Sequence, residues 1–256
     1  MPEFTRSGVR LCWSEAGDPD GLPVVLHTGG AGAGSMWRAG GYVGPLAGFR
    51  LLLYDHRGRG GSDRPAEVAA HRIEEYVADA RTLADVAGLE RYAFFGYSFG
   101  GAIGLRLAAQ DARMRALVAL GAVYDPPGTA VDSAYEEPPQ TGMDALAEMI
   151  EQSEGIALSE ALRREFDDTD AGQFRLTLAA GAGVADPWDE LSSITAQVVL
   201  IAGSEEDPDR VQDEMAVRLP RGRSVHVPGC GHVGAFMRPA EVVAAALPTL
   251  NGARTS

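Results

Sequence analysis

The chain lacks lysine: all 22 basic residues among its 256 are arginine. Lysine supplies the amine of Schiff-base enzymes and the side chain with which a P-loop contacts phosphate groups. The sequence therefore excludes Schiff-base catalysis, and none of its glycine-rich loops is a phosphate-binding P-loop.

Cysteine is scarce, and long apolar runs are absent. Cys12 and Cys230 lie far apart, so neither a disulfide framework nor a metal site is predicted, and Cys230 is expected only to pack. The chain has no run of 18 apolar residues, and Met1 to Arg6 lack the basic and then apolar pattern of a signal peptide. We therefore expect a cytoplasmic protein that does not bind a membrane.

Basic residues are fewer than acidic ones, 22 against 36, which gives a formal net charge of -14. This balance argues against nucleic acid and anionic lipid as partners. The charge is concentrated: residues 124–195 contain 16 acidic and three basic residues, whereas the rest of the chain contains 20 acidic and 19 basic residues. The shift predicts that residues 124–195 form a separate unit, inserted into a core domain made of residues 1–123 and 196–256.

What the sequence does contain is an alternation of strand and helix patterns. Short apolar runs are followed by amphipathic stretches, of which His71 to Leu89 is the clearest. Such alternation predicts an α/β fold with a mostly parallel, doubly wound sheet, and the acidic unit then follows the sixth strand. The expected strands are Phe4–Arg6, Val9–Trp13, Pro23–His27, Arg50–Tyr54, Tyr92–Phe95, Ala116–Val123, Gln197–Ala202 and Ser224–Val227.

A G-x-S-x-G sequence, Gly96 to Gly100, lies between an expected strand and an expected helix. At such a junction the motif is typical of a nucleophile elbow, a turn too tight for side chains at Gly96 and Gly100. The turn presents the serine at the N-terminus of the helix. Ser98 is therefore the candidate nucleophile.

A serine nucleophile needs a base, and the base needs a carboxylate that orients it. In parallel sheets the loops after the strands form the site, and His232 follows the last expected strand, so we predict it as the base. Asp207, just before the proline of the next helix, is predicted as the acid. Glu206 is its nearest rival and Asp125 a third option, while Asp207 could instead cap the helix.

These motifs resemble those of the α/β-hydrolase family over nearly the whole chain. The family order of serine, acid and histidine is met by Ser98, Asp207 and His232. Residues Asp55 to Ser62 match the family block D-x-R-G-x-G-x-S, in which Arg57 is expected to tie loops together rather than touch substrate. Five motifs in the family's order make a chance match negligible.

The segment His27-Thr28-Gly29-Gly30 resembles the family's His-Gly loop, although Thr28 stands where the family usually has glycine. An oxyanion hole needs two backbone N–H groups aimed at the developing negative charge. One is expected from Phe99, directly after the nucleophile. The other is expected from Gly29, or from Gly30 if the departure at Thr28 shifts the register. His27 is expected to hold the loop rather than transfer protons.

The resemblance implies a serine hydrolase that cleaves ester-like bonds of a small molecule through an acyl-enzyme, with no metal or organic cofactor. Esters and lactones are the default substrates, and carbon–carbon bonds are a weaker option. Two alternatives stay open. One is a proline iminopeptidase-like aminopeptidase whose acidic residues receive a free amine, and the other is a non-hydrolytic member (a lyase, a cofactor-free oxygen enzyme or a binding protein).

The resemblance also implies that residues 124–195 form a helical cap over the active site. The sequence leaves a homo-oligomer open. Within the acidic unit, six large apolar residues are expected to form the core of the cap more than the wall of a pocket: Tyr135, Met143, Met149, Phe166, Phe174 and Trp188.

Overall fold

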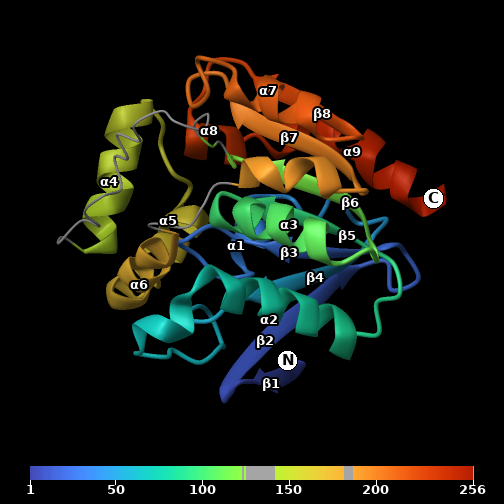
Figure 1. Cartoon of the computed structure of the whole chain (residues 1–256). Coiled ribbons are helices and arrows are strands. Elements are labelled where there is room, and N and C mark those ends of the chain that lie inside the picture. Colours follow the sequence, from blue (N-terminus) through green and yellow to red (C-terminus); the bar gives the residue numbers. More distant parts are fainter. Residues whose placement is uncertain (123, 125–141, 182–186, 256) are drawn as a thin grey trace.

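An eight-stranded sheet with the strand order β1-β2-β4-β3-β5-β6-β7-β8 forms the centre of the protein (Figure 1). The structure is a computed structural model that describes residues 1–122, 124, 142–181 and 187–255. β1 pairs with β2, and β2 with β4, in antiparallel fashion, whereas all the other pairs are parallel. The strands are β1 (Glu3–Arg6), β2 (Val9–Gly17), β3 (Pro23–His27), β4 (Arg50–Asp55), β5 (Tyr92–Tyr97), β6 (Met114–Leu120), β7 (Gln197–Gly203) and β8 (Gly222–Val227).

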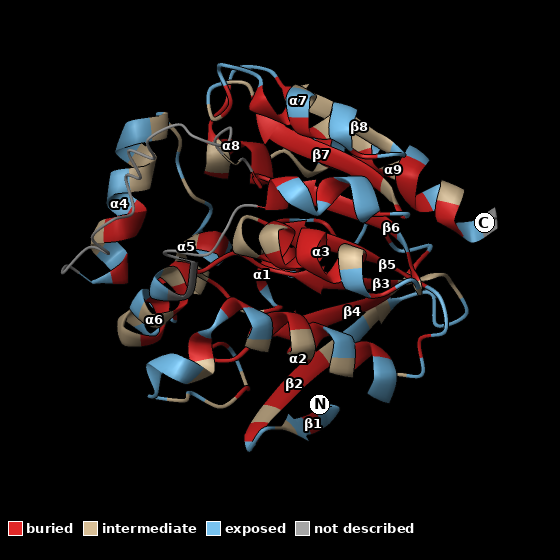
Figure 2. Cartoon of the chain, in the orientation of Figure 1, coloured by how far each residue is buried: buried red, intermediate tan, exposed pale blue. Residues whose placement is uncertain are grey.

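Helices cover both faces of the sheet, which confirms the doubly wound α/β fold. The central strands are buried along almost their whole length, as expected for apolar runs between two helical layers (Figure 2). Successive residues of these strands point to opposite faces and so enter two separate hydrophobic clusters. One cluster contains α2 (Ile73–Val86), α3 (Phe99–Gln110) and α7 (Val211–Arg218), and the other contains α1 (Met36–Ala39), α8 (His232–Phe236) and α9 (Pro239–Thr255).

The period of the apolar residues explains α2, which follows a short 3-10 helix, η1 (Val68–His71). Its buried residues include Ile73, Tyr76, Val77 and Ala80, a spacing that places them on one side of a helix. The helix ends at Val86, earlier than the expected Leu89. Tertiary pairing also changes one strand, because β2 continues to Gly17 alongside β4, beyond the expected end at Trp13.

Further helices are inserted between the sixth and seventh strands, as predicted. They are α4 (Met143–Glu154), α5 (Glu160–Asp167) and α6 (Ala171–Gly181), called the helical insertion below, and two short 3-10 helices follow, η2 (Pro187–Asp189) and η3 (Leu191–Ser193). α4 contacts α8, α5 contacts α1, and α6 contacts η1. Because α1, η1 and α8 follow the carboxyl ends of strands, the insertion lies at that end of the sheet (Figure 1).

The large apolar residues expected in the acidic unit have different surroundings. Met143, Phe166 and Phe174 are buried in one core cluster, while Trp188 is buried in the other and contacts Arg218. Met149 is exposed, and Tyr135 lies outside the described residues. Four of the six side chains are therefore buried, but in clusters shared with the central sheet rather than in a separate core of the acidic unit.

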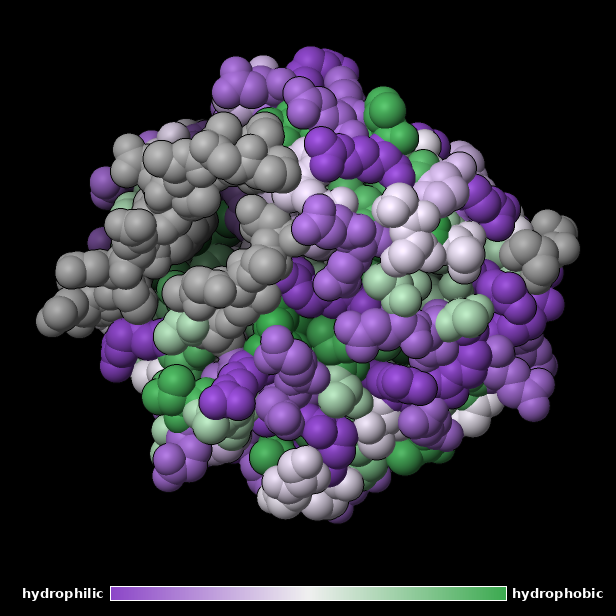
Figure 3. Space-filling model, in the orientation of Figure 1, coloured by the Kyte–Doolittle hydropathy of each residue, from purple (hydrophilic) through white to green (hydrophobic). Residues whose placement is uncertain are grey.

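Hydrophilic residues cover most of the described surface on the face shown in Figure 3. Within the described part of the chain, no helix has the length and apolar character needed to cross a bilayer.

Candidate active site

Ser98 occupies a sharp turn between β5 and α3. Its backbone angles, φ 54° and ψ -119°, lie in a region that residues other than glycine rarely adopt and that costs about 1–3 kcal/mol. The turn is held by two hydrogen bonds: the Ser98 N–H donates to Leu120 O at 2.7 Å, and the Gly101 N–H donates to Ser98 O at 2.8 Å. The strained backbone is thus fixed by the neighbouring strand and by the start of the helix.

Glycine is required on both sides of this serine, as the motif predicts. A Cβ atom at Gly96 would lie 2.1 Å from Gly100 O, and one at Gly100 would lie 2.3 Å from His27 O. Both contacts are with backbone atoms, which cannot move aside as a flexible side chain can. The elbow therefore tolerates no side chain at either position.

His232 begins α8, a short helix that the sequence analysis did not predict, and its partner is a glutamate. Nδ1 of His232 lies 2.6 Å from Oε1 of Glu206, in the turn that follows β7. The His232 side chain is only 24 % exposed, so the contact is shielded from water. Glu206, the rival in the sequence analysis, is therefore the carboxylate that contacts the predicted base.

The predicted contact between Asp207 and His232 is wrong. The Asp207 carboxylate accepts hydrogen bonds from the N–H groups of Val211 (2.7 Å) and Gln212 (3.0 Å), and its Oδ2 lies 3.0 Å from Nε2 of His226. These contacts hold the start of α7 against β8. Asp207 is the helix-capping residue that the sequence analysis weighed as the alternative, and Asp125 lies outside the described residues.

The surroundings of His232 favour its protonated form. Burial lowers the pKa of His232, but the charge and hydrogen bond of Glu206, together with the charge of Glu154, outweigh burial and raise the pKa above its usual 6.5. The ring also stacks on Tyr97, with centroids 5.0 Å apart. Since Tyr97 immediately precedes Ser98, this stacking brings the base next to the elbow.

Gly121, which the sequence analysis did not single out, leaves room for this pair. A Cβ atom there would lie 2.8 Å from Cε1 of His232 and 3.4 Å from Oε1 of Glu206. Its φ of 64° also favours glycine. The sequence analysis placed the end of the sixth strand at Val123 and weighed Asp125 there, whereas β6 ends at Leu120, directly before Gly121.

Gly29 lies against the nucleophile. A Cβ atom at Gly29 would be 3.1 Å from the Cβ and 3.5 Å from the Oγ of Ser98, whereas one at Gly30 would lie 3.1 Å from the ring of Phe174 in α6. Phe99 begins α3, so its N–H belongs to the first turn, where the N–H groups have no acceptor within the helix. Gly29 and Phe99 remain the predicted oxyanion donors.

Two buried basic side chains contact the carbonyl groups of this loop. Nε2 of His56 lies 3.1 Å from Gly29 O, and Nε of Arg59 donates to Gly30 O at 2.8 Å. Burial, with the nearby His27 and Arg59, lowers the pKa of His56 well below 6.5, so the ring is neutral and donates through one nitrogen at a time. The loop is thus held through its carbonyl oxygens, and these contacts do not use its N–H groups.

His27 is buried in the same region, where its Nδ1 lies 2.9 Å from Thr28 O and its ring stacks on His56. Burial lowers the pKa of His27 to about 4, so it is neutral near pH 7. These contacts are those of a residue that holds the loop.

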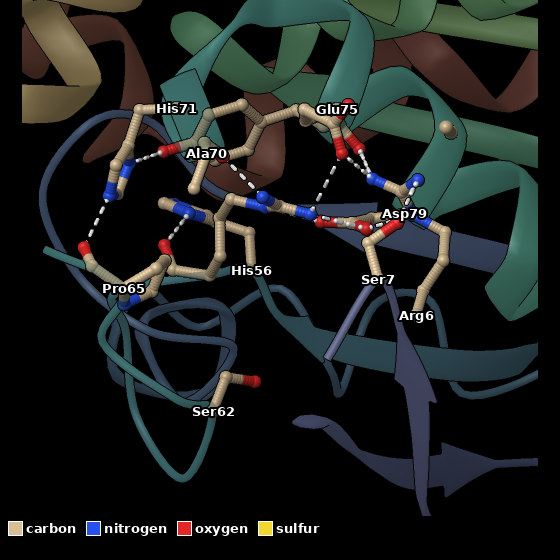
Figure 4. A network of polar contacts seen from close by, with 12 residues as sticks. Arg6, Ser7, His56, Ser62, Pro65, Ala70, His71, Glu75 and Asp79 are labelled. Carbon is tan, nitrogen blue, oxygen red and sulfur yellow. Dashed lines mark hydrogen bonds and ion pairs between the residues drawn. The ribbon is translucent and has the colours of Figure 1, made fainter. Parts of the chain in front are cut away.

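Arg57 links the loop after β4 to α2, and its partners Asp79 and Ala70 are labelled in Figure 4. Its guanidinium makes two hydrogen bonds to Asp79, of 2.7 and 2.8 Å, and a third to Ala70 O. Arg6 donates to the same carboxylate from β1. Because Arg57 and Asp79 are both buried, the arginine joins three parts of the fold, which agrees with the loop-tying role expected from the sequence.

The described residues contain no cluster of three or more histidine, cysteine, aspartate or glutamate side chains arranged to hold a metal ion. The two cysteines are free and buried, and burial raises the pKa of both thiols.

Comparisons with known proteins find enzymes that are similar to part of this chain. A proline iminopeptidase from Neisseria gonorrhoeae is 33% identical over 113 residues, which are 44% of this chain and 36% of that protein. A non-heme chloroperoxidase from Streptomyces lividans is 32% identical over 97 residues, which are 38% of this chain and 34% of the chloroperoxidase. The matched region thus spans little more than a third of each of these relatives.

Whole-chain similarity is found among solved structures. The enol-lactonase from Burkholderia xenovorans LB400 superimposes with a TM-score of 0.80 and 25% identity, covering 98% of this chain and 100% of the lactonase. A family model described as the alpha/beta hydrolase family matches residues 24–246. With this match, the doubly wound sheet and the strained serine elbow, the chain belongs to the α/β-hydrolase family.

Proposed function

We propose that the protein is a serine hydrolase that cleaves an ester or lactone bond of a small molecule. The observation that carries the proposal is the pairing of His232 with Glu206 beside the elbow that presents Ser98. The similarity to an enol-lactonase over 98% of this chain and 100% of the lactonase supports an oxygen ester as the substrate class.

In the proposed mechanism, Ser98 attacks the carbonyl carbon of the substrate while Nε2 of His232 takes the proton from its hydroxyl group. Glu206 accepts the Nδ1–H of His232, which fixes the tautomer with a free Nε2 and stabilises the imidazolium that forms. The N–H groups of Phe99 and Gly29 bind the developing oxyanion. The leaving alcohol takes the proton from His232, and water activated by the same histidine then releases the acid.

A Ser98→Ala variant tests the nucleophile directly. It is expected to lose turnover of p-nitrophenyl esters and labelling by a fluorophosphonate probe, because both need the serine oxygen. The wild-type protein pretreated with the probe is the matched control, and intact mass spectrometry reports one covalent adduct. Labelling of Ser98→Ala at the wild-type rate would exclude Ser98 as the nucleophile.

A proline iminopeptidase-like activity is the second candidate. The similarity to several proline iminopeptidases over part of their length favours it, as does the acidic character of residues 124–195. A panel of p-nitrophenyl esters beside proline p-nitroanilide separates the two candidates. Higher kcat/KM for the esters supports the first, and preference for the anilide overturns it.

A non-hydrolytic reaction in the same site is the third candidate, and the similarity to a non-heme chloroperoxidase is the observation behind it. Measuring ¹⁸O in the products distinguishes hydrolysis from a non-hydrolytic reaction. Hydrolysis in H₂¹⁸O places one ¹⁸O atom in each released acid, whereas a lyase or a binding protein gives no labelled acid.

The remaining parts of the proposal concern the setting of the site. A small molecule is the proposed partner rather than nucleic acid or membrane, in line with the net charge of -14. Residues 124–195 are proposed to act as the cap of the site. A cytoplasmic location is also proposed, and cell fractionation tests it. Light scattering measures whether the protein forms a homo-oligomer.

A further inference from the structure

Glu154, the last residue of α4, contacts the helix that begins with the proposed base. One carboxylate oxygen accepts a hydrogen bond from the Val233 N–H at 2.9 Å, and the other accepts one from the Gly234 N–H at 2.8 Å. These N–H groups belong to the two residues that directly follow His232. The helical insertion is therefore bonded to the backbone of the histidine turn.

Two glycines leave space for this carboxylate. A Cβ atom at Gly231 would lie 2.8 Å from both Cδ and Oε2 of Glu154, and one at Gly234 would lie 3.1 Å from Oε2. Gly231 has a φ of -89°, which any residue can adopt. What glycine provides at position 231 is thus room for Glu154 rather than a special backbone conformation.

The helix that carries Glu154 is itself anchored. Glu151, one turn earlier in α4, accepts a hydrogen bond from the Leu158 N–H at 2.8 Å and pairs with Arg163 of α5 at 2.6 Å. Gly155, in the left-handed conformation, ends α4 directly after Glu154. The carboxylate therefore extends from a fixed helix end, and it makes two charge-assisted hydrogen bonds, which are stronger than neutral ones.

Among the residues that the structure describes, three titratable groups face His232 from the elements packed around it. Glu206 contacts Nδ1 from the turn after β7, Tyr97 stacks on the ring from the end of β5, and Glu154 adds its charge from α4. Cys230 lies two residues before it on the same turn. Of these groups, only Glu154 comes from the helical insertion.

We propose that Glu154 is a positioning residue, which fixes the backbone of the His232 turn and couples the helical insertion to the catalytic base. This inference rests on the proposed function of Ser98 and His232. Its consequence is that a change in α4 alters the chemistry at His232, although α4 contributes no reacting group.

The test measures the rate of fluorophosphonate labelling between pH 5 and 9 for Glu154→Gln. The amide keeps the size of the side chain but removes the charge and one of the two acceptors. We expect the plateau rate to fall by up to about 100-fold, the order of loss when a reacting group is misplaced by 1 Å. The acid limb should move to lower pH, because one of the charges that favour imidazolium is gone. Glu148→Gln, an exposed position in the same helix, is the matched control and should keep the wild-type profile.

A double-mutant cycle tests the same contact, and its Gly231→Ala arm leaves the charge of Glu154 in place. Gly231→Ala should slow labelling because its methyl group displaces the Glu154 carboxylate. In a Glu154→Ala background the same methyl group enters empty space, so the added cost should be several-fold smaller. Gly231→Ala by itself covers the case in which Glu154→Gln fails to fold, as judged by its thermal transition, because it keeps Glu154 in the chain.

The outcomes separate the inference from the function on which it rests. Additive effects of Gly231→Ala and Glu154→Ala, or a Glu154→Gln profile that superimposes on the wild type, overturn the positioning role. Labelling of Ser98→Ala at the wild-type rate overturns the proposed function instead, whatever the Glu154 variants do.

Discussion

Nδ1 of His232 lies 2.6 Å from Oε1 of Glu206, while the carboxylate of the next residue, Asp207, contacts His226 at 3.0 Å. Two adjacent acidic residues thus serve two different histidines. The first pair lies beside the serine elbow and the second holds α7 against β8. Substitutions that separate these two pairs lead to the first predictions.

Replacing Glu206 with glutamine should abolish most of the activity. The neutral amide does not offset the positive charge of the imidazolium. Its NH₂ group donates to Nδ1 and so favours the tautomer in which Nε2 carries the proton. We expect kcat to fall by about 10⁴-fold, as when the triad aspartate of a serine protease becomes asparagine. Steady-state kinetics with a p-nitrophenyl ester measure the change. Asp207→Asn is the matched control, and a larger loss in that variant would contradict the assignment.

Replacing Asp207 with alanine should affect stability more than chemistry. The substitution leaves the N–H groups of Val211 and Gln212 without their acceptor at the start of α7. Loss of such a cap costs about 0.5–2 kcal/mol of the free energy of unfolding. Urea denaturation followed by circular dichroism gives the value. An unchanged midpoint together with lost activity would point to a catalytic role instead.

The pH dependence of kcat/KM should report the raised pKa of His232. Burial lowers that pKa, but the negative charges of Glu206 and Glu154 raise it above 6.5, and only the neutral ring can act as a base. Activity should therefore be complete at high pH and be lost as the pH falls through a midpoint above 6.5. In Glu206→Gln the charge that raises the pKa of His232 most is gone, while burial still lowers that pKa. The residual activity should therefore show a lower midpoint. A midpoint below 6.5 in the wild type would contradict this account.

Substitutions at the two loop glycines should distinguish their roles. In Gly29→Ala the new methyl group lies 3.1 Å from the Cβ of Ser98, so it crowds the nucleophile and should lower kcat. In Gly30→Ala it meets the ring of Phe174 instead, which should change KM more than kcat. Separate kcat and KM values for one ester, measured for both variants, test the difference. Equal loss of kcat at both positions would mean that the loop acts as a unit.

Removing Arg57 should destabilise the fold. Its guanidinium and the Asp79 carboxylate are both buried, and breaking a buried pair from one side costs about 3–5 kcal/mol. Because Arg6 still donates to the Asp79 carboxylate in the variant, we expect a loss at the lower end of this range. Arg57→Met should show this loss in urea denaturation. Arg10→Met, which removes an arginine that forms exposed ion pairs, is the control and should unfold near the wild-type midpoint. Similar midpoints for the two variants would argue against a structural role of Arg57.

Much of the fold could be predicted from local patterns in the chain. Apolar runs between turns indicated the strands because a strand buried on both faces needs apolar side chains at every position. The G-x-S-x-G sequence indicated the elbow because only glycine fits where Gly96 and Gly100 approach backbone atoms. The order of strands and helices then placed Ser98 and His232 at the same end of the sheet.

The tertiary structure alone decided which acid contacts the base. Glu206 and Asp207 are adjacent, and both N–H groups donate to Gly203 O in the turn after β7, so no sequence pattern separates them. The direction in which each side chain leaves that turn sends Glu206 to His232 and Asp207 to the start of α7. In the same way, only the packing of α4 on α8 brought Glu154 to the histidine turn, because hydrogen bonds between residues 79 and 80 positions apart leave no periodic signal in the sequence.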